Sequence, residues 1–314
     1  MALGKATRDA YGEALLELGK ENPLVVIVDG DVQNSTRAEA FAKAYPERSF
    51  QVGIAESNLV GVGSGLAACG KIPFIASFAV FIMANAFDQL RMAVAFPCMN
   101  VKVVGSHSGI SIGEDGPSQM GIEDVALACA LPGFTVVVPA DEHAARAATR
   151  AIAALDGPAY LRTGRSKTAV IYDEGCPRFE LGKGIVLRDG NDVTIIANGL
   201  MVAMALEAAE LLAKEGKQAR VIDMHTVKPL DYELVEKAAR ETRRIVVAEE
   251  HLIGGGLGSY VAAAVAENFP AYMRFIGIDD TYAESGKPEE LLEKYGLTST
   301  HILNCARELT HITG

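Results

Sequence analysis

The sequence predicts an α/β protein with two domains, each a mainly parallel sheet flanked by helices. Apolar runs such as Leu24–Val28 and Val193–Ala197 are typical of strands that are buried on both faces. These runs alternate with helix-length segments, and this alternation is characteristic of parallel sheets. At 314 residues the chain is also too long for one small core. We therefore expect two α/β domains in succession.

The first domain is expected to span residues 1–170. Tyr11, Leu15 and Leu18 form an apolar stripe on its first helix, and Asp141 is a favoured N-cap residue for its last helix. Asp29-Gly30-Asp31 follows the first strand, at the end where α/β sheets bind ligands. In chain order we expect a helix at 5–20, a strand at 24–28, a helix at 36–44, a short strand before residue 56, a strand at 72–78, a helical segment to about 96, a strand at 101–105, a helix at 122–131, a strand at 134–138, a helix from 141 to about 155 and a strand at 159–161.

The second domain is expected to span residues 186–314. The periodicity lapses between about 166 and 184, so we place a linker at 171–185. Pro288 stands near the start of a terminal helix, where proline is favoured. The other expected segments are a strand at 193–197, a helix at 201–215, a strand at 220–223, a helix at 232–240, a strand at 245–248, a helix from 254 to about 268 and a strand at 275–278.

Composition and charge exclude several classes of partner. The net charge of −11 argues against binding to nucleic acid or to an anionic membrane. Five cysteines are scattered without paired spacing, which indicates core thiols in a reducing compartment. The sequence has no signal-peptide pattern and no apolar run of membrane-spanning length. We therefore expect a cytoplasmic protein, in which local Arg and His residues would have to attract any anionic substrate.

The stretch Gln51–Gly65 holds one carboxylate, Glu56, among the apolar residues Val52, Ile54 and Leu59. A glutamate with apolar neighbours is costly to ionise. The glycines that follow it allow another backbone or a ring to approach closely. A structural alternative is a helix start, because the helix dipole favours a carboxylate in the first turn.

Two other kinds of site are not supported by the motifs. The glycine-rich stretches at 61–65 and 254–258 lack the spacing and position of a dinucleotide-binding motif. The six histidines show no metal-ligand spacing, and no Cys-x-x-Cys pair is present. Asp29 and Asp31 flank a glycine, but two carboxylates alone make a weak cation site. We therefore expect no metal site in this chain alone.

Gly105–Gln119 is expected to form a long loop. It contains one histidine, two acidic residues and several hydroxyls beside four glycines and a proline. Loops of this length are usually functional or mobile, although a purely solvated loop is the structural alternative.

This loop carries a family resemblance. Ser106-His107-Ser108-Gly109-Ile110 and then Gly113-Glu-Asp-Gly-Pro-Ser-Gln119 follow the Gly-Ile-Ala-Glu56 stretch by about 50 residues. Together these motifs resemble transketolase. The resemblance covers essentially the whole chain, as a pyrimidine-binding domain followed by the C-terminal domain of the family. The run Ala283–Leu292 is also similar to deoxyxylulose-phosphate synthase, a relative.

The resemblance implies that the chain binds part of thiamine diphosphate. Glu56 matches the glutamate that hydrogen-bonds N1′ of the aminopyrimidine and promotes its 4′-imino form, which generates the ylid nucleophile. Phe78 and Phe81 match the aromatic residues that pack on the pyrimidine ring. Asp31 matches an aspartate near the cofactor. Without the resemblance, both phenylalanines would be interpreted as core residues.

The resemblance also implies a sugar phosphate substrate. Asp115 matches the aspartate that contacts a sugar hydroxyl. His107, Arg8, Arg162 and Ser35 match residues that hold the phosphate of the sugar. Arginine suits that role because its guanidinium fork matches the geometry of phosphate oxygens.

The chain departs from the family pattern in three places. Gln119 stands where many transketolases have a histidine, and Ala84 and Asn85 fall where a third aromatic residue is expected. The motif that binds magnesium, Gly-Asp-Gly followed by Asn, is missing, because Asp29-Gly30-Asp31 is not that motif. The resemblance therefore implies an amino-terminal partner subunit that holds Mg²⁺ and the diphosphate, with two copies of each chain in an α2β2 complex.

We therefore expect the C-terminal subunit of a two-chain transketolase that transfers a two-carbon ketol unit between ketose and aldose phosphates. Three alternatives stay open at this point. A deoxyxylulose-phosphate synthase would share Glu56 and the fold, and the β subunit of a 2-oxo acid dehydrogenase would have similar domains. A non-catalytic subunit that only binds a partner would have no need to retain Glu56, His107, Asp115 and Arg162 together.

Overall fold

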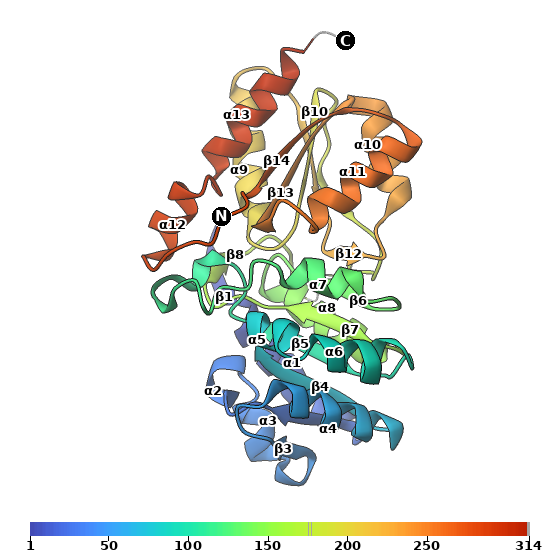
Figure 1. Cartoon of the computed structure of the whole chain (residues 1–314). Helices are drawn as coiled ribbons and strands as arrows, with labels where there is room; N and C mark the ends of the chain where they lie inside the picture. Colours follow the sequence, from blue (N-terminus) through green and yellow to red (C-terminus); the bar gives the residue numbers. More distant parts are fainter. Residues whose placement is uncertain (175, 177, 313–314) are drawn as a thin grey trace.

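The computed structural model describes residues 1–174, 176 and 178–312, and it confirms the predicted fold class of two mainly parallel sheets flanked by helices (Figure 1). The first sheet has the strand order β12-β6-β7-β5-β4-β2-β3. All its neighbours are parallel except β12, which is antiparallel to β6. Its strands are β2 (Val25–Asp29), β3 (Ser49–Gln51), β4 (Ile72–Phe78), β5 (Lys102–Ser106), β6 (Thr135–Val137), β7 (Ala159–Arg162) and β12 (Thr226–Lys228).

Helices cover both faces of this sheet because its strands are apolar on both sides; every residue of β2 is buried. The predicted stripe of Tyr11, Leu15 and Leu18 is buried, and Asp141 caps its helix by accepting from the Ala144 amide at 2.8 Å. The helices are α1 (Thr7–Glu21), α2 (Gln33–Thr36), α3 (Glu39–Ala44), η1 (Pro46–Arg48), α4 (Glu56–Ala68), α5 (Ala79–Ala84), α6 (Phe87–Gln89), η2 (Leu90–Ala95), η3 (Ile110–Asp115), α7 (Asp124–Ala130) and α8 (Glu142–Ala154).

The second sheet has the order β14-β13-β10-β11-β9, with only β9 antiparallel to its neighbour. Its strands are β9 (Ile185–Arg188), β10 (Val193–Ala197), β11 (Ala219–Asp223), β13 (Arg244–Leu252) and β14 (Tyr272–Ile278). The helices around it are α9 (Met201–Lys214), α10 (Tyr232–Thr242), α11 (Leu257–Asn268), α12 (Pro288–Lys294) and α13 (Ser299–Thr310). Across the described part of the chain, no helix combines the length and the apolar character needed to cross a membrane.

Several short elements were not predicted, and the expected loop at 105–119 contains the short 3₁₀ helix η3. Strands β1 (Leu3–Ala6) and β8 (Lys167–Ala169) pair with each other antiparallel, apart from both large sheets. The expected helix at 36–44 is divided into α2 and α3 by Arg37, which adopts a left-handed backbone conformation with φ 67°. The predicted linker at 171–185 lies between β8 and β9, and two of its positions, 175 and 177, are outside the described residues.

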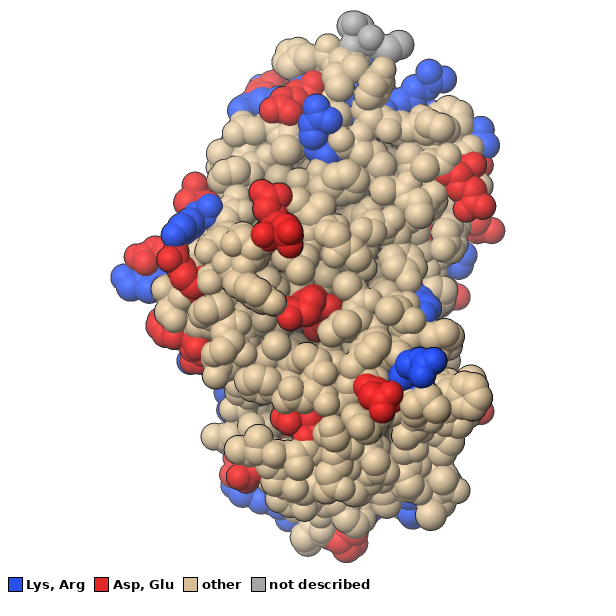
Figure 2. All heavy atoms as spheres, viewed as in Figure 1, with Lys and Arg blue, Asp and Glu red and all other residues tan. Residues whose placement is uncertain are grey.

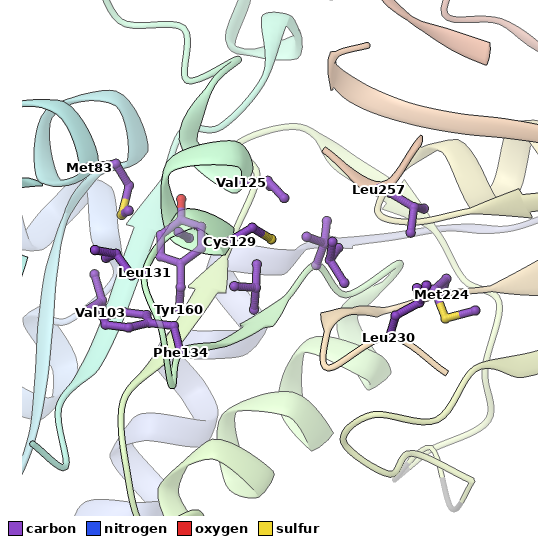
Figure 3. Packing of buried hydrophobic residues seen from close by; sticks show 14 of the residues in the cluster. Met83, Val103, Val125, Cys129, Leu131, Phe134, Tyr160, Met224, Leu230 and Leu257 are labelled. Carbon is purple, nitrogen blue, oxygen red and sulfur yellow. The ribbon is translucent and has the colours of Figure 1, made fainter. Parts of the chain in front are cut away.

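The two halves of the chain share one hydrophobic core. Val125, Cys129 and Phe134 from the first half belong to the same buried cluster as Met224 and Leu257 from the second half (Figure 3). Strand β12 adds to this contact by pairing with β6 across the two halves. Burial of this apolar surface stabilises the contact between the two halves of the chain.

Candidate active site

A cleft of about 320 Å³ lies at the carboxyl ends of β4, β5 and β7, where a parallel sheet presents its ligand-binding loops. Its lining brings together several of the predicted site residues with others that were not predicted. The lining residues are Arg8, Asn34, Ser35, Arg37, Phe78, His107, Asp115 and Arg165.

His107 is fixed in this cleft by three contacts. Its Nε2 lies 2.9 Å from Arg8 Nη1, and its Nδ1 lies 2.9 Å from Ser106 Oγ. Its ring stacks on Phe78 with centroids 4.1 Å apart. Since a guanidinium only donates, Nε2 accepts the hydrogen bond from Arg8 and the ring proton belongs on Nδ1. His107 therefore presents a neutral imidazole in a defined tautomer.

The charge of the cleft agrees with this assignment. Burial and the nearby guanidiniums of Arg8, Arg165 and Arg37 lower the pKa of His107 to about 3. Burial and Arg37 likewise lower the pKa of Arg8, with a further contribution from Arg165. Like charges gathered in a half-buried cleft repel one another unless an anion offsets them. The cleft is therefore suited to an anionic group, against the negative charge of the whole chain.

Asp115 and Ser35 also line this cleft. Asp115 Oδ1 accepts from Arg165 Nη1 at 3.1 Å, in a half-exposed pair that substrate could rearrange. The same Arg165 nitrogen donates to the Ile112 carbonyl at 3.3 Å. The carbonyl of Ser35 accepts from Arg8 Nη1 at 3.1 Å, so this loop also orients Arg8 toward His107.

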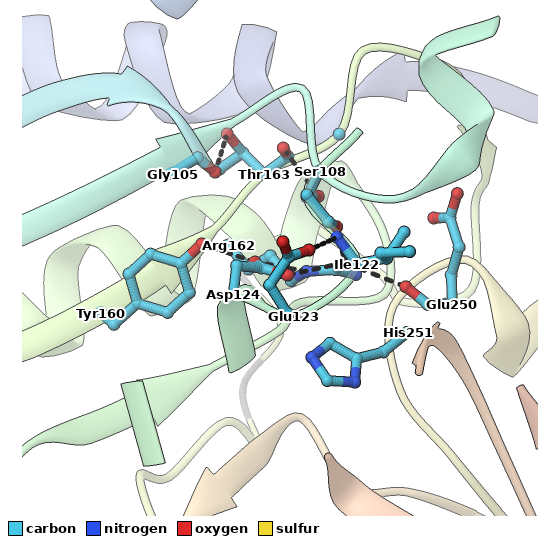
Figure 4. A network of polar contacts seen from close by, with 12 residues as sticks. Gly105, Ser108, Ile122, Glu123, Asp124, Tyr160, Arg162, Thr163, Glu250 and His251 are labelled. Carbon is cyan, nitrogen blue, oxygen red and sulfur yellow. Dashed lines mark hydrogen bonds and ion pairs between the residues drawn. The ribbon is translucent and has the colours of Figure 1, made fainter. Parts of the chain in front are cut away.

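Arg162 is a correction to the predicted set, because its guanidinium is only 5% exposed and is already bonded (Figure 4). Its Nε and Nη2 donate to both carboxylate oxygens of Asp124, at 2.8 and 3.1 Å. Nη2 also donates to the carbonyls of Gly121 and Glu250, each at 2.9 Å. Arg162 therefore has a structural role in the interior of the protein. Arg165 is the arginine after β7 that lines the cleft.

Glu56 is the first residue of α4 and is 6% exposed. Its Oε1 accepts from Ser77 Oγ at 3.1 Å, which links the start of α4 to the end of β4. The predicted apolar surround is only partly present, because Leu59 is buried but Ile54 is 79% exposed. Ile54 precedes the helix in a loop and faces outward.

The two predicted aromatic residues lie together next to this carboxylate. Phe78 ends β4 immediately after Ser77, and Phe81 lies in the first turn of α5. Their rings are nearly parallel, with an interplanar angle of 13° and centroids 6.0 Å apart. Both are half-buried, so part of each ring is accessible to a ligand. Glu56, Phe78 and Phe81 thus remain candidates for binding one flat heterocycle that has a proton-accepting nitrogen.

Asp31 lies at the same edge of the first sheet, whereas the carboxylate of Asp29 is already hydrogen-bonded within the protein. The Asp31 amide donates to Gln51 Oε1 at 2.7 Å, which ties the loop after β2 to the end of β3. Asp29 is fully buried and accepts from the Val32 amide at 2.7 Å and from Thr36 Oγ1 at 3.1 Å. Within residues 1–174, 176 and 178–312, no group of three or more His, Cys, Asp or Glu side chains is placed to hold a metal.

Comparison with known proteins adds to this geometry. Residues 4–170 match the family model of the transketolase pyrimidine binding domain, and residues 182–302 match that of the transketolase C-terminal domain. The chain belongs to the transketolase family. Its two matched segments follow one another in the order that the sequence predicts.

Transketolase relatives resemble nearly all of this chain. It is 43% identical over 300 residues to a protein of Methanocaldococcus jannaschii named as a transketolase C-terminal section, with 95% of this chain and 94% of that one covered. It is 43% identical over 303 residues to the 6-deoxy-6-sulfo-D-fructose transketolase subunit SqwH of a Clostridium species, covering 96% and 94%. Against human transketolase the identity is 41% over 308 residues, and the match covers 97% of this chain but 49% of the human protein.

A solved split-gene transketolase has the same fold. That structure, described as an inactive β4 tetramer, is 47% identical and has a TM-score of 0.91, with 98% of this chain and 99% of that chain covered.

The described residues fit one half of the thiamine diphosphate that transketolases use. Glu56 offers a buried carboxyl and Phe78 and Phe81 offer parallel ring faces, which suit an aminopyrimidine. The metal that accompanies the diphosphate needs carboxylate or similar ligands, and no group of three or more His, Cys, Asp or Glu side chains placed to hold one occurs in the part of the chain that the structure describes.

Three residues of the cleft were missed by the sequence reasoning: Arg165, Arg37 and Asn34. Arg165 stands beyond the end of β7, in a loop, where ligand-binding residues of α/β sheets are usual. This position after the strand was the feature of the sequence that could have identified Arg165. Arg37 and Asn34 flank Ser35 in the loop and short helix after β2, and no pattern in the sequence marked them.

Proposed function

We propose that this chain is the C-terminal subunit of a transketolase divided over two chains, which transfers a two-carbon ketol unit between ketose and aldose phosphates. The main support is the cleft in which Arg8, Arg165 and His107 gather beside the Glu56, Phe78 and Phe81 group. An amino-terminal subunit would supply the Mg²⁺ and diphosphate contacts.

In this proposal each residue has a separate task. Thiamine diphosphate, when bound, supplies the carbanion chemistry that a ketol transfer needs. Glu56 holds a proton at N1′ of its pyrimidine, and Phe78 and Phe81 orient the ring. Arg8, Arg165 and Ser35 bind the phosphate of the sugar, and the neutral His107 accepts from Arg8 and so holds that guanidinium in place for the phosphate. Asp115 accepts a hydrogen bond from a sugar hydroxyl.

A second class of anionic sugar is supported by one relative. The Clostridium protein is named for 6-deoxy-6-sulfo-D-fructose, whose end group is a sulfonate. Guanidiniums bind sulfonate oxygens by the same charge-assisted hydrogen bonds that bind phosphate. The cleft of Arg8, Arg37 and Arg165 would accept either group, so both sugars belong in the assay.

Reconstitution tests the proposal. We expect the purified chain to bind thiamine diphosphate and Mg²⁺ weakly and to transfer no ketol unit. Adding an amino-terminal transketolase subunit should confer both tight binding and transfer, because burying a diphosphate requires a metal or similar compensation. Isothermal titration and a coupled transfer assay measure the two properties. Tight Mg²⁺-dependent binding by the lone chain would show that the site is complete without a partner.

We further propose that the chain associates with a second copy of itself. Ile54, Met92 and Phe96 are large apolar side chains with exposed fractions of 79%, 50% and 80%. Figure 2 shows that charged side chains are sparse over much of one face of the molecule. Large exposed apolar patches usually mark interfaces, and the 47% identical relative is described as a tetramer.

The oligomeric state of the lone chain tests this second proposal. We expect sedimentation to show a dimer or larger species, and Phe96→Ser to weaken it by about tenfold or more, since burying an aromatic ring is worth several kcal/mol at an interface. A chain that is monomeric at high concentration contradicts the proposal. So does a Phe96→Ser variant that assembles as well as the wild type.

A further inference from the structure

The carboxyl end of β13 contacts three different parts of the protein through three consecutive buried side chains. Glu249 accepts from the Leu257 and Gly258 amides of α11, both at 2.8 Å. Glu250 Oε1 accepts from the Ser111 amide at 2.6 Å, and His251 Nε2 accepts from the Ala126 amide of α7 at 3.3 Å. Glu249 thus bonds within its own domain, whereas Glu250 bonds to the first domain.

The Ser111 amide belongs to the loop that carries His107 and Asp115. The start of this loop is held by the first sheet, since the Ser108 amide donates to the Thr163 carbonyl at 3.3 Å. Gly109 then donates to the Gly121 carbonyl at 2.7 Å. Between these contacts and Asp115, Glu250 is the carboxylate that accepts from the loop backbone. Ser111 stands between His107 and Asp115 in sequence, so the hydrogen bond to Glu250 holds the loop between the two cleft residues.

The fit between Glu250 and the loop is close. Gly109 adopts φ 75°, and a Cβ atom there would lie 2.1 Å from the Glu250 carboxyl carbon. Only glycine adopts this conformation readily and leaves room for the carboxyl. The main chain of Glu250 is itself fixed, because its carbonyl accepts from Arg162 Nη2 at 2.9 Å (Figure 4). The loop therefore lies directly against the Glu250 carboxyl, and the Ser111 hydrogen bond opposes its movement away from β13.

We infer that Glu250 is a positioning residue of the second domain, which holds the loop so that His107 and Asp115 face Arg8 and Arg165. The two pairs depend on it because His107 lies 2.9 Å from Arg8 and Asp115 lies 3.1 Å from Arg165, and these are distances that a small loop shift would break. This role rests on the proposed function of the cleft as the anion-binding site. It also gives the second domain a part in organising that site.

The charge of Glu250 decides which variants are informative. Burial raises the pKa of Glu250, although Arg162 and Ser111 oppose that shift. Glutamine resembles the neutral carboxyl in shape and can still accept from the Ser111 amide, so Glu250→Gln is the conservative variant. Glu250→Ala removes the acceptor, and Glu250→Leu removes it while keeping the volume. Glu249→Ala is the matched control, because Glu249 is equally buried on the same strand but bonds to α11.

The first measurement uses the isolated full-length chain with inorganic phosphate as the probe. The ¹⁵N imidazole signals of His107 are assigned by their loss in His107→Gln. We expect Glu250→Ala and Glu250→Leu to shift these signals and to weaken phosphate binding by about tenfold or more, as a misplaced binding group does. Glu250→Gln and Glu249→Ala should match the wild type in both. If the Ala and Leu variants leave His107 unmoved, or if Glu249→Ala moves it equally, Glu250 has no positioning role.

The second measurement uses the reconstituted enzyme. Glu250→Leu should raise KM for the anionic sugar by about tenfold while the Kd for thiamine diphosphate stays within about twofold, since the loop does not include Glu56 or Phe81. Equal losses in both would indicate a general structural defect and overturn the inference. If wild-type reconstitution gives no transfer while His107 still moves only in the Glu250 variants, the positioning role stands and the proposed function fails.

Discussion

Replacing Glu56 by glutamine should abolish ketol transfer by the reconstituted enzyme while leaving the fold intact. The amide keeps the volume of the side chain, and its oxygen can still accept from Ser77 Oγ, which now bonds Glu56 Oε1 at 3.1 Å. An amide cannot take or return the proton that the carboxyl is proposed to hold at N1′. Positioned acid–base groups contribute about 10²–10⁴-fold to rate, so we expect a loss in that range.

A steady-state assay measures the loss of ketol transfer, and thermal unfolding measures whether the fold is intact. Ser77→Ala is the complementary control, because it removes the hydrogen bond to residue 56 but keeps the carboxyl, and we expect it to cost no more than about 1 kcal/mol, or a few-fold in rate. Activity of Glu56→Gln within about tenfold of wild type, equivalent to 1.4 kcal/mol, would remove Glu56 from the chemistry.

The sheet architecture was predictable because its signals are local. Continuous apolar runs predicted β2, β4, β5 and β10, and in the structure every residue of β2, β5 and β10 is buried. Strand β12 was not predictable. Its three residues pair with β6, about 90 residues earlier, and Lys228 donates to the carbonyls of Cys129 and Leu131 at 2.9 and 2.6 Å. Such a contact depends on the packing of the whole chain and leaves no periodic pattern.

The sequence identified the loop of the candidate site, but it did not distinguish between the two arginines near the end of β7. His107, Asp115 and Arg8, which the family motifs assign to the substrate, line one cleft. Arg162 and Arg165 follow the same strand at nearly the same distance, so sequence alone does not separate them. What separates them is direction. Arg162 is the last residue of β7 and its side chain points into the protein, whereas Arg165 lies beyond the strand and reaches the cleft.

Replacing Arg162 by methionine should therefore lower the free energy of unfolding sharply. That result would indicate a structural role for Arg162 in place of its predicted role in substrate binding. Asp124 is completely buried, and Arg162 and the Tyr160 hydroxyl are its charged and polar partners, with Tyr160 Oη donating at 2.6 Å. Burial opposes the ionisation of Asp124, but Arg162 and its hydrogen bonds hold the pKa of Asp124 below the usual value. Removing one partner of a buried ion pair typically costs about 3–5 kcal/mol. That is a large share of the roughly 5–15 kcal/mol that stabilises a typical domain.

The pH dependence and a matched variant distinguish this prediction from a general packing defect. With Arg162 present, the depressed pKa of Asp124 stabilises the fold above the unfolded pKa, and this contribution is lost as pH falls through the folded pKa. In Arg162→Met the pKa of the unpaired Asp124 should rise above its unfolded value, so the deficit should narrow as pH is lowered from about 8 to 5. Arg165→Met is the control: it breaks a half-exposed pair worth about 0–1 kcal/mol, and should keep the stability while weakening binding of the sugar phosphate. Urea unfolding of both variants at two pH values measures the difference. A fully stable Arg162→Met, or a deficit that grows on acidification, would show that the Asp124 pair does not carry this stability.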